Sequence, residues 1–274
     1  MRNTDLTEYN LRYEEILRCI QKLRLFDDDF FTRCFDGNVA CTELLLHVIL
    51  EKPDLKVMEA TVQYTIKNLQ GRSVRLDIFA VDSTGKRYNI EIQRDDRGAG
   101  AKRARYNSSL IDSNILLAGD DPENLPENFV IFIAEHDVLG GNKPVYHIDR
   151  VIQETSRLFG DGSHIVYVNG AWRDDSPVGK LMHDFSCADP NNMNYPLLAD
   201  RVRYFKEDKE GVQTMCKIIE DYGKETAREN LLTNLKTLME TMNLSIEQAM
   251  DALRVPPEER DSIKSSVFAG GPHI

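Results

Sequence analysis

The spacing of apolar residues changes twice along the chain, and each change predicts a different kind of element. In the first fifty residues apolar side chains recur at helical spacing, as in the stripe from Leu17 to Leu23, until Pro53 ends this helical block. Beyond that proline the period becomes two, which predicts β-strands. Helical spacing returns after Pro190, and the proline-free stretch 201–242 predicts one long amphipathic helix.

The period-two segment predicts a three-stranded meander with short turns. The first strand begins near Lys56, and the second reads VRLDIFAVD over residues 74–82. A Ser-Thr-Gly-Lys turn at 83–86 then leads into RYNIEIQR over residues 87–94. Strands joined in this way pair with their neighbours in the chain, so residues on the second and third strands are expected to lie close together.

Two later runs are typical of strands that are buried on both faces of a sheet. They are FVIFIAE at 129–135 and HIVYVNG at 164–170, and both are largely apolar. Before these two runs, the glycine pair Gly98 and Gly100 is followed by a segment from Ala101 whose apolar spacing predicts a helix. Helices and strands of this order predict a mixed sheet with helices beside it.

The whole pattern therefore predicts an α/β fold with a mixed central sheet flanked by helices over residues 1–190. A helical C-terminal region is expected over residues 191–274. Within it, Ser245 and Gln248 have the spacing of a capping box, and Pro257 marks the start of a last short helix.

The composition of the chain limits the binding partners and the cellular compartment that we expect for it. With 34 Lys and Arg against 45 Asp and Glu, the net charge of -11 opposes non-specific adhesion to nucleic acid or anionic lipid, so such a partner must meet a local basic patch. Five cysteines without a C-x-x-C pair argue against a disulfide framework or a zinc finger. The charged start and the absence of a long apolar run predict a cytoplasmic protein with no membrane partner.

The candidate chemistry lies on the second and third strands of the meander. Asp77 is on one strand and Glu91 on its hairpin partner, while Gln93 projects from the same strand face as Glu91. Carboxylates that converge from adjacent strands suit Mg²⁺, which activates water and neutralises charge on a phosphate. The alternative is that these acids form the solvated face of a half-exposed strand.

A basic cluster follows directly, and it is the densest in the chain. Its members are Arg94, Arg97, Lys102, Arg103 and Arg105. In an acidic protein, cations beside two carboxylates favour recognition of a phosphate backbone, although a solvated helix face would have the same pattern. Glu43, on an early helix, is a further candidate metal ligand, and a helix-start position explains it equally well.

The order of these motifs resembles the PD-(D/E)XK nuclease superfamily, and within it the PD-(D/E)XK nuclease family transposases related to recombination-promoting nucleases. The resemblance spans nearly the whole chain. It rests on Arg75-Leu-Asp77 and Asn89-Ile-Glu91-Ile-Gln93, and on three longer blocks at 129–150, 181–221 and 242–260.

This resemblance implies a restriction-endonuclease-like core and divalent-metal-dependent cleavage of DNA, linked to mobile elements or recombination. Asp77 and Glu91 match the acidic pair of the motif, with Mg²⁺ as the expected cofactor and Mn²⁺ as a substitute. Leu76 replaces the proline of the motif and Gln93 replaces its lysine. Either a cation that stabilises the transition state comes from elsewhere, with Arg94 and Lys102 as the candidates, or the activity is low.

Three readings remain open at this point. The first is a Mg²⁺-dependent DNA endonuclease that uses Asp77, Glu91 and Gln93. The second is a weak or inactive nuclease-like scaffold that binds DNA or a protein, and the third is a nuclease that acts on RNA by the same chemistry. Apolar positions along the long C-terminal helix can pack on its own core or pair two copies, and we expect a homodimer.

Overall fold

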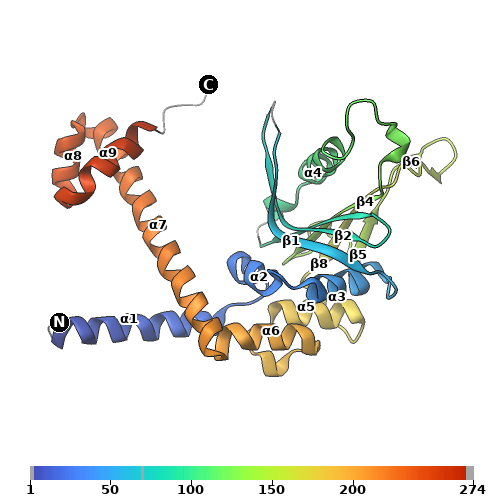
Figure 1. Ribbon diagram of the computed structural model, residues 1–274, viewed down its shortest axis with the longest axis horizontal. Coiled ribbons are helices and arrows are strands. Elements are labelled where there is room, and N and C mark those ends of the chain that lie inside the picture. Colours follow the sequence, from blue (N-terminus) through green and yellow to red (C-terminus); the bar gives the residue numbers. More distant parts are fainter. Residues whose placement is uncertain (1–2, 69–70, 95, 270–274) are drawn as a thin grey trace. The chain divides into compact units, whose positions relative to one another are not determined.

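The computed structural model describes residues 3–68, 71–94 and 96–269. These residues form two compact units, which are Leu17–Val212 and the combination of Met1–Ile16 with Gln213–Ile274 (Figure 1). The expected boundary at residue 190 stays a prediction, and residues 191–212 belong to the same compact unit as the sheet. None of the described helices combines the length and the apolar character that a membrane span requires.

A six-stranded mixed sheet forms the centre of the larger unit, with the order β1-β2-β3-β4-β8-β5. The first three strands are an antiparallel meander, as the alternating pattern predicts. The strands β4 and β8 run parallel to β3, while β5 is antiparallel to β8 at the edge. The strand bounds are β1 Val57–Ile66, β2 Val74–Asp82, β3 Arg87–Gln93, β4 Asn128–Ala134, β5 Val145–Ile148 and β8 Ser163–Asn169, with a small hairpin of β6 Val151–Ile152 and β7 Arg157–Leu158.

Helices cover both faces of this sheet. One face carries α4, and the other carries α2, α3, α5 and α6 (Figure 1). The helix bounds are α1 Asn3–Lys22, α2 Asp28–Phe35, α3 Val39–Leu50, α4 Ala101–Ser113, α5 Pro177–Ser186, α6 Pro196–Glu207, α7 Lys209–Met242, α8 Ile246–Ala252 and α9 Arg260–Ala269, with short 3-10 turns η1 Asp96–Ala99, η2 Pro122–Asn124, η3 Pro190–Asn192 and η4 Pro257–Glu259. The predicted α/β class, with a mixed sheet between helices and a helical C-terminal region, is confirmed.

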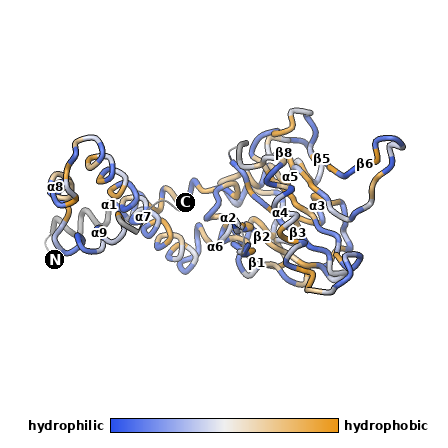
Figure 2. Tube along the Cα trace, turned by 90° about the horizontal axis from the view of Figure 1, so that it is seen from above, coloured by the Kyte–Doolittle hydropathy of each residue, from blue (hydrophilic) through white to orange (hydrophobic). Residues whose placement is uncertain are grey.

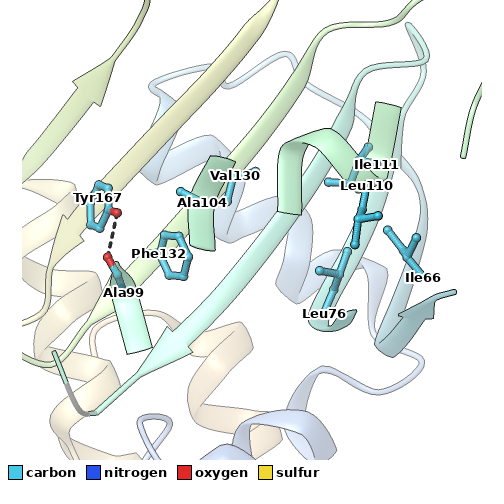
Figure 3. Packing of buried hydrophobic residues seen from close by; sticks show 9 residues of the cluster. All are labelled: Ile66, Leu76, Ala99, Ala104, Leu110, Ile111, Val130, Phe132 and Tyr167. Carbon is cyan, nitrogen blue, oxygen red and sulfur yellow. Dashed lines mark hydrogen bonds between the residues drawn. The ribbon is translucent and has the colours of Figure 1, made fainter. Parts of the chain in front are cut away.

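Apolar packing fixes α4 on its face of the sheet. Leu110 and Ile111 of the helix pack in one cluster with Val130 and Phe132 of β4 (Figure 3). Apolar colouring is also prominent along β2 (Figure 2). At the other end of the helix, the hydroxyl of Tyr167 donates to the Ala99 carbonyl over 2.8 Å. The first turn of α4 is thereby held beside the end of β3.

The opposite face is built from aromatic side chains around the start of α2. The rings of Phe26 and Phe185 meet edge to face at 5.5 Å between centroids, and Phe31 also packs against Phe185. The buried ammonium of Lys206 donates to the carbonyl oxygens of Gln21, Leu23 and Ala188. Burial of a charged group is tolerated when its donors are paired, so Lys206 ties α6 to the segment that leads into α2.

The predicted single helix over 201–242 is wrong, because the structure has two helices that meet at Asp208. This residue has an extended backbone conformation, and its side chain accepts a bond from the Glu210 amide. Gly211 then approaches Tyr204 so closely that an added Cβ would lie 2.1 Å from the Tyr204 carbonyl oxygen. Apolar residues keep helical spacing on both sides of Asp208, so the sequence pattern does not indicate the break. A helix can end through a change in the backbone of one residue, which leaves that spacing intact.

The smaller unit has its own apolar core, in which α7 packs against α8 and α9. Leu235 is fully buried there, and Leu231 and Leu238 pack around the same core. This arrangement corresponds to the alternative in which the stripe of α7 serves its own chain. Ser245 and Gln248 form the predicted capping box at the start of α8. A homodimer through α7 stays a prediction.

We predict that Gly170→Ala destabilises the larger unit, because this glycine follows β8 at a point of close approach. An added Cβ would lie 2.3 Å from the Ala134 carbonyl oxygen and 2.5 Å from the Phe26 ring. Overpacking of this kind lowers the free energy of unfolding by about 1–3 kcal/mol, to be measured by urea denaturation. Gly223→Ala is the control, since nothing lies within 4 Å of its added Cβ, and it should not destabilise. An unchanged midpoint for Gly170→Ala would contradict the prediction.

Candidate active site

The structure brings Asp77 and Glu91 together where the pairing of β2 and β3 ends. The last register pair is Ile78 with Ile90, and its continuation would set Asp77 opposite Glu91. The carboxylate of Asp77 instead accepts the backbone N–H of Ile92 over 2.8 Å. The side chain of Asp77 therefore occupies the space between the two strands, next to Glu91.

Both carboxylates have raised pKa values, and the largest cause for each is its removal from solvent. Glu91 is fully buried, and this burial together with the charge of Asp77 raises its pKa well above the ordinary range for glutamic acid. Burial also raises the pKa of Asp77, with a further contribution from Asp28. Two acids in this position repel each other when ionised, so the site favours a positive charge between or beside them.

Arg103 of α4 provides such a charge in the structure. Its guanidinium forms an ion pair with the Glu91 carboxylate, donates to the Gly98 carbonyl over 2.9 Å and lies over the Phe132 ring. The amide of Asn107, one helical turn further along, approaches the other oxygen of Glu91 at 3.4 Å. The first half of α4 therefore contacts the acidic pair directly.

Gln93 lies at the edge of the same site. Together with Asp77 it lines a cleft of about 1240 Å³. Gly98 faces its amide closely, because an added Cβ there would be 1.7 Å from the Gln93 Oε1 atom. The prediction that Gln93 accompanies the two acids at the end of the meander therefore agrees with its position, whereas its role stays a prediction.

Six cations are among the residues that line the cleft beside Asp77. Of the predicted basic cluster, Arg94, Lys102, Arg103 and Arg105 line it, whereas the side chain of Arg97 lies outside the described residues. Arg72 and Arg75 line the cleft from the β2 side, and the sequence analysis did not single them out as phosphate contacts. Arg75 lies two residues before Asp77, so both project from the same face of the strand, and this spacing could have predicted Arg75 at the site.

Arg94 has a structural task besides its place in the cleft. Its guanidinium is 2.7 Å from a carboxylate oxygen of Asp27 and 3.4 Å from one of Glu135. Arg24 lies 2.9 Å from the other oxygen of Glu135. These ion pairs connect the start of α2 with the ends of β3 and β4, and they engage the charge of Arg94.

Asp28, in the first turn of α2, is an acid that the sequence analysis missed at this site. It lines the cleft, and burial together with the adjacent Asp29 raises its pKa, while Arg75 and Arg103 lower it. The run Asp27-Asp28-Asp29 reads as a helix start in the sequence. Only the packing of α2 against the sheet brings one of its members near Asp77.

The structure does not bring Glu43 to the acidic pair. Its carboxylate accepts the backbone N–H of Val57 over 2.9 Å and pairs with the ammonium of Lys56. Val57 pairs with Asp82, which is five residues along β2 from Asp77 and hence roughly 16 Å away at the rise of a strand. Glu43 anchors the start of β1 instead, so we do not carry it into the proposed metal site.

Asp77 and Glu91 are the predicted metal ligands that the structure places next to each other. Among the described residues, no group of three or more His, Cys, Asp or Glu side chains is arranged to hold a metal. Mg²⁺ is commonly held by one or two carboxylates, with water and substrate phosphate at the other positions. The mutual repulsion of the pair, and the Arg103 guanidinium that balances Glu91, show that a cation is electrostatically suited to this position.

Comparison with known proteins agrees with the resemblance of the motifs. A family model described as PD-(D/E)XK nuclease family transposase matches residues 33–169, which is half of the 274-residue chain. The matched segment contains Asp77, Glu91, Gln93 and all of α4. No curated protein and no solved structure matches the chain. With a mixed sheet of the expected kind and the acidic pair where the pairing of β2 with β3 ends, this chain belongs to the PD-(D/E)XK nuclease family transposases.

Proposed function

We propose that the protein is a divalent-metal-dependent DNA endonuclease that acts in recombination or on mobile elements. The observation that carries this proposal is the pairing of the half-buried Asp77 with the fully buried Glu91 beside a cleft to which six cations contribute. In a chain with a net charge of -11, this local reversal of charge is suited to a polyanionic backbone.

Asp77 and Glu91 would hold Mg²⁺, with Mn²⁺ as a substitute. When bound, the ion supplies an activated water and neutralises charge on the phosphate. In the hydrolysis, a water oxygen forms a bond to phosphorus, one ester P–O bond breaks, and the water proton leaves for solvent or the departing oxygen. Gln93, with a neutral amide that can both donate and accept, would orient this water or a phosphate oxygen.

The remaining cations of the cleft would position the backbone of the nucleic acid. Lys102 and Arg105 on α4 and Arg72 and Arg75 near β2 lie along two walls of the cleft. Contacts to phosphates from Arg and Lys fix the register of a duplex without reading its sequence. DNA is the proposed substrate because the family is one of transposases, and RNA is the competing substrate that the assay below includes.

We predict that Asp77→Asn and Glu91→Gln each abolish cleavage and weaken binding of Mn²⁺. Both changes keep the shape of the side chain but remove the negative charge that a divalent ion needs. Plasmid nicking measures the first effect, and calorimetric titration of Mn²⁺ measures the second, with DNA and RNA oligonucleotides cut in parallel.

Glu43→Gln is the matched control, because Glu43 lies outside the cleft and a glutamine can still accept the Val57 N–H. It should bind metal and cut like the wild type. A wild type that neither binds Mn²⁺ nor cuts would favour the scaffold alternative. Preferential cutting of RNA would correct the substrate.

We predict that the metal-free protein loses stability as the pH rises from about 4 to about 8. A carboxyl with a folded-state pKa above its unfolded value stabilises the fold when protonated, and this contribution disappears as the pH passes from the unfolded to the folded value. Raised pKa values of Asp77 and Glu91 have this sign. Urea denaturation in EDTA should show a loss on the order of 2 kcal/mol that is smaller in the Asp77→Asn/Glu91→Gln double variant. If the free energy of unfolding changed equally with pH in the wild type and in the double variant, the prediction would be contradicted.

A homodimer in the cytoplasm completes the proposal. Two copies related by a two-fold axis would present two such clefts to the two strands of a duplex. Sedimentation at micromolar protein concentration should therefore give twice the 31.3 kDa chain mass. A monomeric mass in the presence of duplex DNA would count against this form.

A further inference from the structure

Gln93 is neutral, so the proposed site lacks the positive charge that a lysine at this position would provide. A neighbouring side chain can provide that charge instead. In the motif that this chain resembles, the corresponding position is a lysine, which carries a positive charge. A glutamine amide cannot neutralise the charge that develops on the scissile phosphate, and preorganised positive charge is a large contribution to phosphoryl chemistry. A second cation, besides the divalent ion, would add to this stabilisation if it reached the same place.

Arg103 reaches this place from α4. The surroundings of Gly98 show that Arg103 is near Gln93. A Cβ added to Gly98 would lie 1.7 Å from Gln93 Oε1 and 3.6 Å from a guanidinium nitrogen of Arg103. The same nitrogen donates to the Gly98 carbonyl over 2.9 Å. Glycine at position 98 thus lets the Gln93 amide and the Arg103 guanidinium lie side by side at the end of β3.

The guanidinium is held in position and still faces the cleft. Its carbon lies 5.8 Å from the centre of the Phe132 ring, and its second nitrogen pairs with Glu91. The side chain retains 39% of its exposure although Glu91 is fully buried. An arginine arranged in this way can contact the acid with one edge and a phosphate oxygen with another, since it has five N–H donors in a planar fork.

The other cations near Gln93 are less suited to this task. The charge of Arg94 is engaged by Asp27 and Glu135 at the start of α2. Lys102 is exposed on the preceding position of α4, about 100° around the helix from Arg103, so the two side chains leave the helix in different directions. Among the described cations of the cleft wall, Arg103 is the one with an ion pair to the acidic pair.

We propose that Arg103 is the cation that replaces the lysine of the motif. In the structure its guanidinium balances Glu91. With a divalent ion held by Asp77 and Glu91, the guanidinium would turn its N–H donors to the scissile phosphate, beside the water that Gln93 would orient. This inference rests on the proposed nuclease function.

The test compares Arg103→Gln, Arg103→Lys and the double variant Arg103→Gln/Gln93→Lys in the full-length protein. Arg105→Gln is the matched control, because Arg105 lies on the same helix and lines the same cleft but has no ion pair with the acids. Two quantities are measured for each protein, namely Mn²⁺ binding by calorimetry without DNA and the rate of plasmid nicking at saturating Mn²⁺. Thermal melting confirms that each variant is folded.

We expect Arg103→Gln to slow nicking about 100-fold, the usual effect of removing one preorganised donor. Mn²⁺ binding should persist, because Asp77 and Glu91 are intact. Arg103→Lys should retain part of the rate, and Gln93→Lys should restore at least a tenth of the wild-type rate to Arg103→Gln by returning the charge to the strand position. Arg105→Gln should affect DNA affinity more than the rate.

Two outcomes would overturn the inference while leaving the proposed function intact. One is a wild-type nicking rate in Arg103→Gln. The other is a parallel loss of Mn²⁺ binding and nicking that neither Arg103→Lys nor Gln93→Lys repairs, since Arg103 would then only support the position of Glu91. Failure of the proposed function itself looks different, because the wild-type protein would then neither bind Mn²⁺ nor nick DNA.

Discussion

A fully buried carboxylate beside a second carboxylate is the constraint on which the rest of this site depends. An isolated ionised acid in the protein interior is strongly disfavoured, so Glu91 must be protonated, paired with a cation or bound to a metal. Asp77 increases this requirement because its charge raises the pKa of Glu91 further. A positive charge next to Glu91 is therefore favourable, and among the described residues Arg103 provides one through its ion pair.

The fold places that partner through contacts remote from the chemistry. Packing of Leu110 and Ile111 against the sheet sets the position of α4, and the bond from Tyr167 to Ala99 fixes the entry to the helix. On the other face, Lys206 holds the segment before α2. The walls of the cleft therefore rest on separate packed elements, which is the kind of rigid support that a preorganised site requires.

Charge is distributed so that one region differs from the rest of the molecule. The chain is acidic as a whole, yet arginines from β2, from the end of β3 and from α4 converge around the cleft. Such an arrangement restricts a polyanion to the cleft, because the remaining surface repels it. A place in the cleft does not by itself make a cation available to a ligand. The charge of Arg94 is already paired with Asp27 and Glu135.

The sequence by itself determined what depends on local pattern. Period-two alternation and short turns predicted the meander, and a hairpin places Asp77 near Glu91 because strands with a short connection pair with each other. The capping box of Ser245 and Gln248 was equally local. The order of motifs also identified the family, since several matches in sequence are much more specific than one.

Only the tertiary structure decided which distant residues join the site. Asp28 reaches the cleft through the packing of α2, whereas Glu43 is used at the start of β1, and their sequence contexts as acids near helix starts do not distinguish them. The pairing of Arg103 with Glu91 joins α4 to β3, and the break between α6 and α7 includes a close approach of Gly211 to Tyr204, so both depend on tertiary contacts. Periodicity reports the face on which a side chain lies, but contacts between elements depend on how those faces pack in three dimensions.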